Sequence, residues 1–269
     1  MNNLVVRLLT GIVFISAIIG AILWNQWAAS LIFGGFMLLG IHEFTGLINK
    51  NTGYKIPRIL TLLVALLVFV GFIANFAGML TNQVVSFSVI LIAVISLITS
   101  IYADSTNAIQ RSALTFFGWL YILIPFLLIT HMCFTPGNKW EIIGMFILIW
   151  TNDSMAYATG RLIGKTKLFE RISPKKTWEG TIGGIIFTLG VGFLWSFYVS
   201  EMPLIFWIIC SPLVAVAAIF GDLFESQIKR QLGVKDSGTL LPGHGGILDR
   251  FDAALMAIPI FYGLWMIYH

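Results

Sequence analysis

Long apolar segments dominate this chain and constrain its fold more than any other feature. Nine of them approach the roughly 20 residues that a helix needs to cross a bilayer. They lie near residues 8–24, 28–48, 59–77, 84–102, 112–133, 141–160, 180–199, 204–222 and 249–268. Only 10% of the residues are charged and 58% are hydrophobic, whereas a soluble domain has roughly 25% charged residues. We therefore expect an all-α, polytopic membrane bundle of about nine transmembrane helices.

The connecting segments are too short to form a separate soluble domain, so we expect one membrane domain over residues 1–269. Loop charges orient it. If the loops alternate between the two sides, the side of the N-terminus receives 15 of the 16 Lys and Arg residues, and the other side receives only Lys139. Positive loops stay on the cytoplasmic side. The sequence therefore predicts a cytoplasmic N-terminus in an integral membrane protein of the bacterial inner membrane.

The basic residues concentrate in two cytoplasmic loops, 161–180 and 226–252, which together hold ten of the 15. Residues 1–133 contain no comparable concentration of basic residues, and we interpret them as scaffold helices. We interpret residues 141–269 as the catalytic half. The main polar exception in the scaffold is the pair His42 and Glu43. An interfacial position or a helix–helix hydrogen bond is favoured for this pair over a substrate contact.

Carboxylates accompany the basic loops. Asp153 lies inside segment 141–160, Asp222 ends segment 204–222, and Asp249 and Asp252 open the last segment on one helix face. A single such aspartate is often a helix-start residue or the partner of an arginine. Several acids together at membrane depth need compensating cations, and oxygen ligands favour Mg²⁺, which usually takes one or two carboxylates plus substrate phosphates.

The two loops have the composition of phosphate sites. Lys175 and Lys176 precede a predicted helix N-terminus, where free N–H groups favour anions. The turn at 242–246 reads Pro-Gly-His-Gly-Gly, and its glycines can present backbone N–H groups to a phosphate. His244 either donates a hydrogen bond to a phosphate, acts as an acid, or has a structural role. These features predict a membrane enzyme with a phosphorylated substrate, but the spacing leaves phosphoryl transfer, nucleotidyl transfer and hydrolysis open.

Segment 226–252 resembles the signature of the phosphatidate cytidylyltransferases. The matching residues are Ser226, Lys229, Arg230, Lys235, Asp236, Gly238, Pro242, His244, Gly245, Gly246, Asp249, Arg250 and Asp252. Upstream segments 152–160, 173–180 and 221–226 also resemble family segments. The resemblance covers about 100 residues, and the first five apolar segments match only in hydropathy and size.

This resemblance implies that CTP and phosphatidic acid react to give CDP-diacylglycerol and pyrophosphate, for phospholipid biosynthesis. It places Asp222 and Asp249 on Mg²⁺, leaves a second cation open, and puts Asp252 beside them. Asp153 and His244 become catalytic-site residues without a fixed role. The substrate-binding residues that it implies are Lys175, Lys176, Lys229, Arg230, Lys235, Arg250 and Ser226.

The expected partners are CTP, phosphatidic acid and the lipid bilayer, with no nucleic acid; the many apolar helix faces permit a homodimer. Two other functions compete. A CTP-dependent polyprenol kinase would transfer the γ-phosphate to an alcohol, but the complete 226–252 motif argues against it. A transporter for an anionic metabolite would also carry acids and cations, but the ionisable residues gather at one face and no inverted repeat is visible.

Overall fold

Helices make up most of the computed structural model, which describes residues 3–103, 107–199, 201–238 and 245–268. The chain forms two compact units. The first unit comprises Met1–Phe134 and Asp236–Leu248, and the second comprises Thr135–Lys235 and Asp249–His269. Each predicted apolar segment is helical over most of its length, which confirms the all-α membrane architecture.

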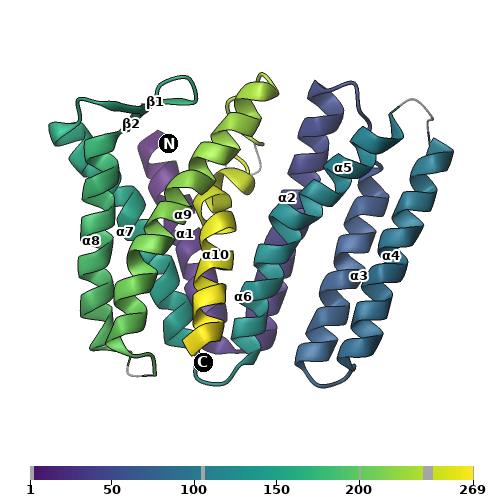
Figure 1. The fold of residues 1–269 in the computed structure, drawn as a ribbon, viewed down its shortest axis with the longest axis horizontal. Coiled ribbons are helices and arrows are strands. Elements are labelled where there is room, and N and C mark those ends of the chain that lie inside the picture. Colours follow the sequence, from purple (N-terminus) through teal and green to yellow (C-terminus); the bar gives the residue numbers. More distant parts are fainter. Residues whose placement is uncertain (1–2, 104–106, 200, 239–244, 269) are drawn as a thin grey trace. The chain divides into compact units, whose positions relative to one another are not determined.

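The first unit contains the N-terminal helices (Figure 1). They are α1 (Asn3–Trp24), α2 (Gln26–Asn51), α3 (Arg58–Phe76), α4 (Asn82–Ala103), α5 (Ala108–Gly118), the π-turn η1 (Trp119–Leu123) and α6 (Ile124–Phe134). The central helix is α2, which packs against α1, α3 and α6. Its buried side includes Phe33, Met37 and Ile41, all of which are almost fully excluded from solvent.

Local signals set the helix boundaries in this unit. The side chain of Asn25 caps α2 by accepting hydrogen bonds from the N–H groups of Trp27 and Ala28, at 3.0 and 2.9 Å. Pro57 precedes α3. The π-turn η1 lies just before Pro125, which has no N–H for the regular helical hydrogen bond. The predicted segment 112–133 is therefore one apolar stretch divided into α5, η1 and α6.

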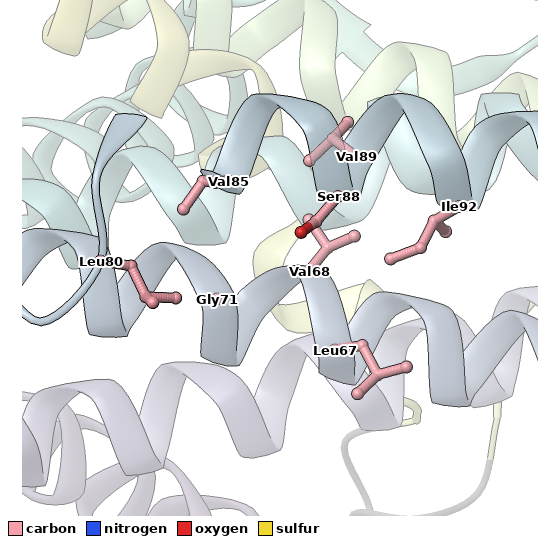
Figure 2. Close-up of a pocket in the computed structure, with 8 residues that line it drawn as sticks. All are labelled: Leu67, Val68, Gly71, Leu80, Val85, Ser88, Val89 and Ile92. Carbon is pink, nitrogen blue, oxygen red and sulfur yellow. The ribbon is translucent and has the colours of Figure 1, made fainter. Parts of the chain in front are cut away.

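A small apolar groove lies between α3 and α4, with a volume of about 200 Å³ (Figure 2). Among the eight residues that line it, Ser88 alone has a polar side chain, and its hydroxyl donates to Val84 O in the same helix at 2.8 Å. A groove without a charged group cannot neutralise a triphosphate, so this groove does not fit the CTP site that the sequence predicts.

The second unit contains the C-terminal helices and a short hairpin. They are α7 (Lys139–Ile163), β1 (Lys167–Phe169), β2 (Ser173–Thr177), α8 (Trp178–Ser196), α9 (Leu204–Gln231) and α10 (Leu248–Tyr268). Helices α7, α8 and α9 pack against one another, with the hairpin at the start of α8 (Figure 1). Close packing depends on Gly180, where a Cβ atom would lie 2.6 Å from Ala156 O of α7.

Two boundaries differ from the prediction. Helix α9 does not end at Asp222 but continues to Gln231, because the polar residues after Asp222 bond along the helix rather than leaving it. Residues 167–177 form a hairpin rather than a loop, with Lys167 opposite Thr177 and Phe169 opposite Ser173. Both corrections affect segments that carry predicted site residues.

Six helical stretches of the described residues are long and apolar enough to span a membrane. They are Gln26–Asn51, Arg58–Phe76, Ala108–Phe134, Trp178–Ser196, Leu204–Gln231 and Leu248–Tyr268. Helix α7 falls outside this set and carries Lys139, Glu141, Asp153 and Arg161. A membrane protein is supported, while the count of nine spans stays a prediction.

Candidate active site

The hairpin of the second unit positions two neighbouring lysines differently. Successive residues of a strand point to opposite sides, and on β2 Lys175 is exposed whereas Lys176 is partly buried. The Nζ atom of Lys176 lies 2.8 Å from Asp222 Oδ2 and also donates to Ile219 O at 3.3 Å. Lys176 is therefore fixed against α9, while Lys175 remains at the surface.

Glu179 holds the hairpin in place. It lies in the first turn of α8, and its carboxylate accepts hydrogen bonds from the N–H groups of Lys165 and Thr166, each at 3.1 Å. The side chain of Thr177 caps the same helix by accepting from Gly180 N at 3.2 Å. These bonds tie both ends of the 164–178 segment to α8 and so determine where Lys176 lies.

Helix α9 presents a row of polar residues at helical spacing. Ser226 is four residues after Asp222, and its hydroxyl donates to Asp222 Oδ1 at 3.2 Å. Both oxygens of Asp222 thus have partners, Ser226 on one and Lys176 on the other. The Asp222 side chain nevertheless stays 34% exposed, so other ligands can still reach it.

Lys229 links α9 to α10. Its Nζ atom lies 3.1 Å from Glu225 Oε1, one turn earlier, and 2.6 Å from Asp249 Oδ1 in the first turn of α10. The three side chains are 11%, 3% and 7% exposed in the order Lys229, Glu225, Asp249. A buried charge is costly unless it is paired, so this triad stabilises the junction of the two helices.

The start of α10 brings a further acid to α9. A Cβ atom at Gly221 would lie 2.5 Å from Asp252 O, so the absence of a side chain at Gly221 allows the two backbones to approach. Asp252 is partly exposed, and its Oδ1 accepts from Ala253 N at 2.7 Å. The Gly221 contact places Asp222 and Asp252 beside each other across the helix pair.

Negative charge exceeds positive charge in this region of the second unit. The carboxylates of Asp153, Asp222 and Asp252 are close enough to repel one another. Glu225 and Asp249 add two more acids. Among the described residues, the ion pairs of this cluster come from Lys176 and Lys229. Five acids against these two lysines and the exposed Arg250 leave a net negative environment that attracts further cations.

Comparison with known proteins decides the family. The model of the cytidylyltransferase family matches residues 5–268, nearly the whole chain. The chain belongs to this family. It is 33% identical to the phosphatidate cytidylyltransferase of Haemophilus influenzae over 95% of this chain and 96% of that protein. It is 33% identical to the one of Staphylococcus haemolyticus over 83% of this chain and 85% of that protein.

The sequence identity is higher over a shorter alignment with a third relative. The phosphatidate cytidylyltransferase of Bacillus subtilis is 45% identical over 44% of both chains. The resemblance drawn from the motifs is therefore confirmed at the level of the family.

The structure of this cytidylyltransferase brings together eight of the predicted site residues. They are Asp153, Lys176, Asp222, Ser226, Lys229, Asp249, Arg250 and Asp252, all on β2, α7, α9 or the first two turns of α10. Arg250 is exposed beside Asp249. Asp153 is also exposed, and its Oδ1 receives a 3.5 Å contact from Asn152 Nδ2.

Three of the remaining predicted residues lie at the surface of the second unit. Lys175 and Lys235 are exposed. Arg230 is also exposed, and its guanidinium donates to Val234 O at 3.2 Å, where it closes the C-terminal end of α9. His244 lies outside the described residues. Contacts of these four with the substrates stay predictions.

Two residues of the cytidylyltransferase were not assigned from sequence. Glu225 pairs with Lys229 on the continuous helix α9. The i, i+4 spacing of the two residues is the sequence signal that could have predicted this ion pair. The prediction that α9 ends at Asp222 concealed that spacing. Glu179 fixes the hairpin through backbone amides. A residue that accepts from backbone N–H groups leaves no side-chain pattern in a sequence.

The donor set of the cluster suits a hard cation. All five acids offer carboxylate oxygens, which are the ligands that Mg²⁺ prefers, and Mg²⁺ needs only one or two of them when phosphates supply the rest. Across the described residues, no three Asp, Glu, His or Cys side chains are already arranged around a common metal position. Lysine ammonium groups contact Asp222 and Asp249 in this structure.

Proposed function

We propose that this protein transfers the cytidylyl group of CTP to phosphatidic acid and so produces CDP-diacylglycerol and pyrophosphate for phospholipid biosynthesis. The observation that carries the proposal is the near full-length match to the phosphatidate cytidylyltransferase of Haemophilus influenzae. The lysine–carboxylate cluster of the second unit supports it. A reaction between two phosphate substrates needs basic groups that bind the phosphates and carboxylates that can hold a cation.

The reaction forms one bond and breaks one. A phosphate oxygen of phosphatidic acid attacks the α-phosphorus of CTP. A new P–O bond forms as the bond from the α-phosphorus to the β-phosphate oxygen breaks, and its electron pair leaves with pyrophosphate. Since the attacking oxygen is already anionic at neutral pH, no general base is needed, and positioning and charge stabilisation account for the catalysis.

The residues of the cluster divide between these two tasks. Asp222 and Asp249 would hold Mg²⁺, and Asp252 and Asp153 would add negative charge beside them. The bound cation would offset the charge of the pyrophosphate leaving group. Lys176 and Lys229 supply ammonium groups for substrate phosphates, and the exposed Arg250 offers a planar guanidinium that can bind a phosphate through two parallel hydrogen bonds.

The location of the site follows from the same assignment. Phosphatidic acid stays in the bilayer and CTP arrives from the cytosol, so the cluster must be open to both. The exposed Lys167, Arg171 and Lys175 on the hairpin segment are the kind of loop charges that remain on the cytoplasmic side. We place the protein in the bacterial inner membrane with the active site facing the cytoplasm, where its many apolar helix faces permit a homodimer.

Pyrophosphate release by the purified protein in mixed micelles tests the proposal. CTP, phosphatidic acid and Mg²⁺ are omitted one at a time. Release that requires all three components, together with a CDP-lipid product, is the expected result. Release of CDP in place of pyrophosphate would make the protein a CTP-dependent kinase, and the absence of turnover with any lipid phosphate would reject both enzymatic functions.

A further inference from the structure

Glu43 is an acidic residue of α2 that none of the roles above uses. Its side chain is buried within the first unit, with 9% of the residue exposed. A carboxylate in such a place needs several donors. Glu43 finds them in the segment before α10, where Oε1 accepts from Ile247 N at 2.9 Å and Oε2 accepts from Leu248 N at 3.0 Å. The hydroxyl of Ser237 also donates to Oε2, at 3.2 Å.

These bonds supply a helix cap that the local sequence lacks. The first N–H groups of a helix have no partner within it, and Ser, Thr, Asp or Asn usually satisfies them from the position before the helix. Here Ile247 occupies that position before Leu248, the first residue of α10. Glu43 provides the acceptor from another helix, and its negative charge also suits the positive end of the α10 dipole.

Gly238 and Gly246 both fit closely against the same carboxylate. A Cβ atom at Gly238 would lie 2.8 Å from Glu43 Oε1. A Cβ atom at Gly246 would collide with Glu43 Oε2 and with the Ser237 hydroxyl. Leu248 is seated against α2 as well, because a Cβ atom at Gly40 would lie 3.3 Å from its Cδ2. The contact with α2 is therefore a fitted surface and not a single hydrogen bond.

From these contacts we infer that Glu43 is a positioning residue for the active site: it fixes the start of α10 and thereby the direction in which Asp249 and Asp252 project. Asp249 directly follows Leu248, and Asp252 lies one turn later on the same helix. The inference rests on the proposed function, because the two aspartates are assigned there. The inference assigns Glu43 no contact with substrate, because the residue is buried and both its oxygens accept hydrogen bonds from the chain.

Hydrogen–deuterium exchange and steady-state kinetics of Glu43→Gln test this inference. The glutamine keeps the shape of the side chain but offers one acceptor oxygen where two are used. We expect the amides of Ile247 and Leu248 to exchange more than about tenfold faster, because hydrogen bonds to charged groups are the stronger ones. We also expect kcat to fall about 10- to 100-fold, the usual effect of losing a residue that orients catalytic ligands, with little change in the KM for CTP.

Glu141→Gln is the matched control. Glu141 is a fully buried acid of α7 whose Oε2 accepts from Trp265 Nε1 at 2.8 Å. The Glu141→Gln substitution should lower the melting temperature. It should not speed amide exchange at Ile247 and Leu248, and it should not lower kcat specifically. Unchanged exchange at these two amides in folded Glu43→Gln would overturn the inference. The inference would also be overturned if Glu43→Gln and Glu141→Gln lowered the melting temperature equally and Glu43→Gln lost no more kcat than Glu141→Gln.

If Glu43→Gln does not fold, Ser237→Ala provides a second test of the same inference. It removes one of the three donors, so exchange and kcat should change in the same direction by a smaller factor, and wild-type values for both would overturn the inference. Exchange of the wild-type protein does not depend on which reaction it catalyses. Failure of the wild type to form a CDP-lipid would therefore reject the proposed function, whereas the exchange data decide the role of Glu43.

Discussion

The two units handle buried negative charge in different ways. In the first unit, Glu43 is satisfied by backbone N–H groups and a serine hydroxyl, which cannot leave without disturbing the fold. In the second unit, Asp222 and Asp249 are paired with the side-chain ammonium groups of Lys176 and Lys229. A carboxylate fixed by backbone amides is suited to hold structure, whereas one balanced by lysines can exchange partners with an incoming ligand.

Removing the charge of Asp249 should produce the largest loss of activity. Asp249→Asn keeps the shape of the side chain but removes the negative charge that the proposed cation and Lys229 share. We expect turnover to fall at least about 100-fold, the lower end of the effect when a group that stabilises transition-state charge is lost. Initial rates of pyrophosphate release in folded protein measure it, and near wild-type turnover would exclude Asp249 as a metal ligand.

Lys229→Met tests the same region through stability. The change removes the cation shared by the buried Glu225 and Asp249. Deleting one partner of a buried ion pair costs about 3–5 kcal/mol, so a marked fall in thermal stability in detergent is expected together with loss of activity. Lys229→Arg retains the charge and should recover part of the stability. Equal melting temperatures for Lys229→Met and wild type would show that the triad does not stabilise the helix junction.

Lys176→Ala should have a smaller and more selective effect. The Lys176 side chain is 24% exposed and its ammonium group contacts Asp222, so the loss of this pair costs little stability. We expect the apparent KM for CTP or for phosphatidic acid to rise by roughly tenfold, consistent with one lost charged hydrogen bond. Lys167→Ala, an exposed lysine on β1 of the same hairpin, is the control. Unchanged KM values for both substrates would remove Lys176 from the site.

Cys133→Ser should have the smallest effect. Cys133 lies in α6 of the first unit, which holds none of the proposed catalytic carboxylates, and its side chain is partly exposed. Turnover and melting temperature should both stay within experimental error of the wild-type values. A clear loss of turnover would mean that α6 contributes to catalysis and would weaken the contrast between the two units.

The sequence predicts the helices well because long apolar segments allow few alternatives in a membrane. It predicts the acids of the second unit because ionisable residues are rare in such segments. It could not reveal that α9 continues past Asp222 to Gln231, since the polar residues there look like a loop until their ion pairs are known. It also could not assign Glu43, whose partners are backbone amides of residues about 200 positions later.

The most direct test of cytidylyl transfer follows each phosphorus atom of CTP. Purified protein in phosphatidic acid micelles with Mg²⁺ receives CTP labelled at either the α- or the γ-phosphate, and the lipid and aqueous products are separated. Our account predicts that the α-label enters the lipid while the γ-label leaves as pyrophosphate. Transfer of the γ-label to lipid, with CDP left in solution, would contradict it.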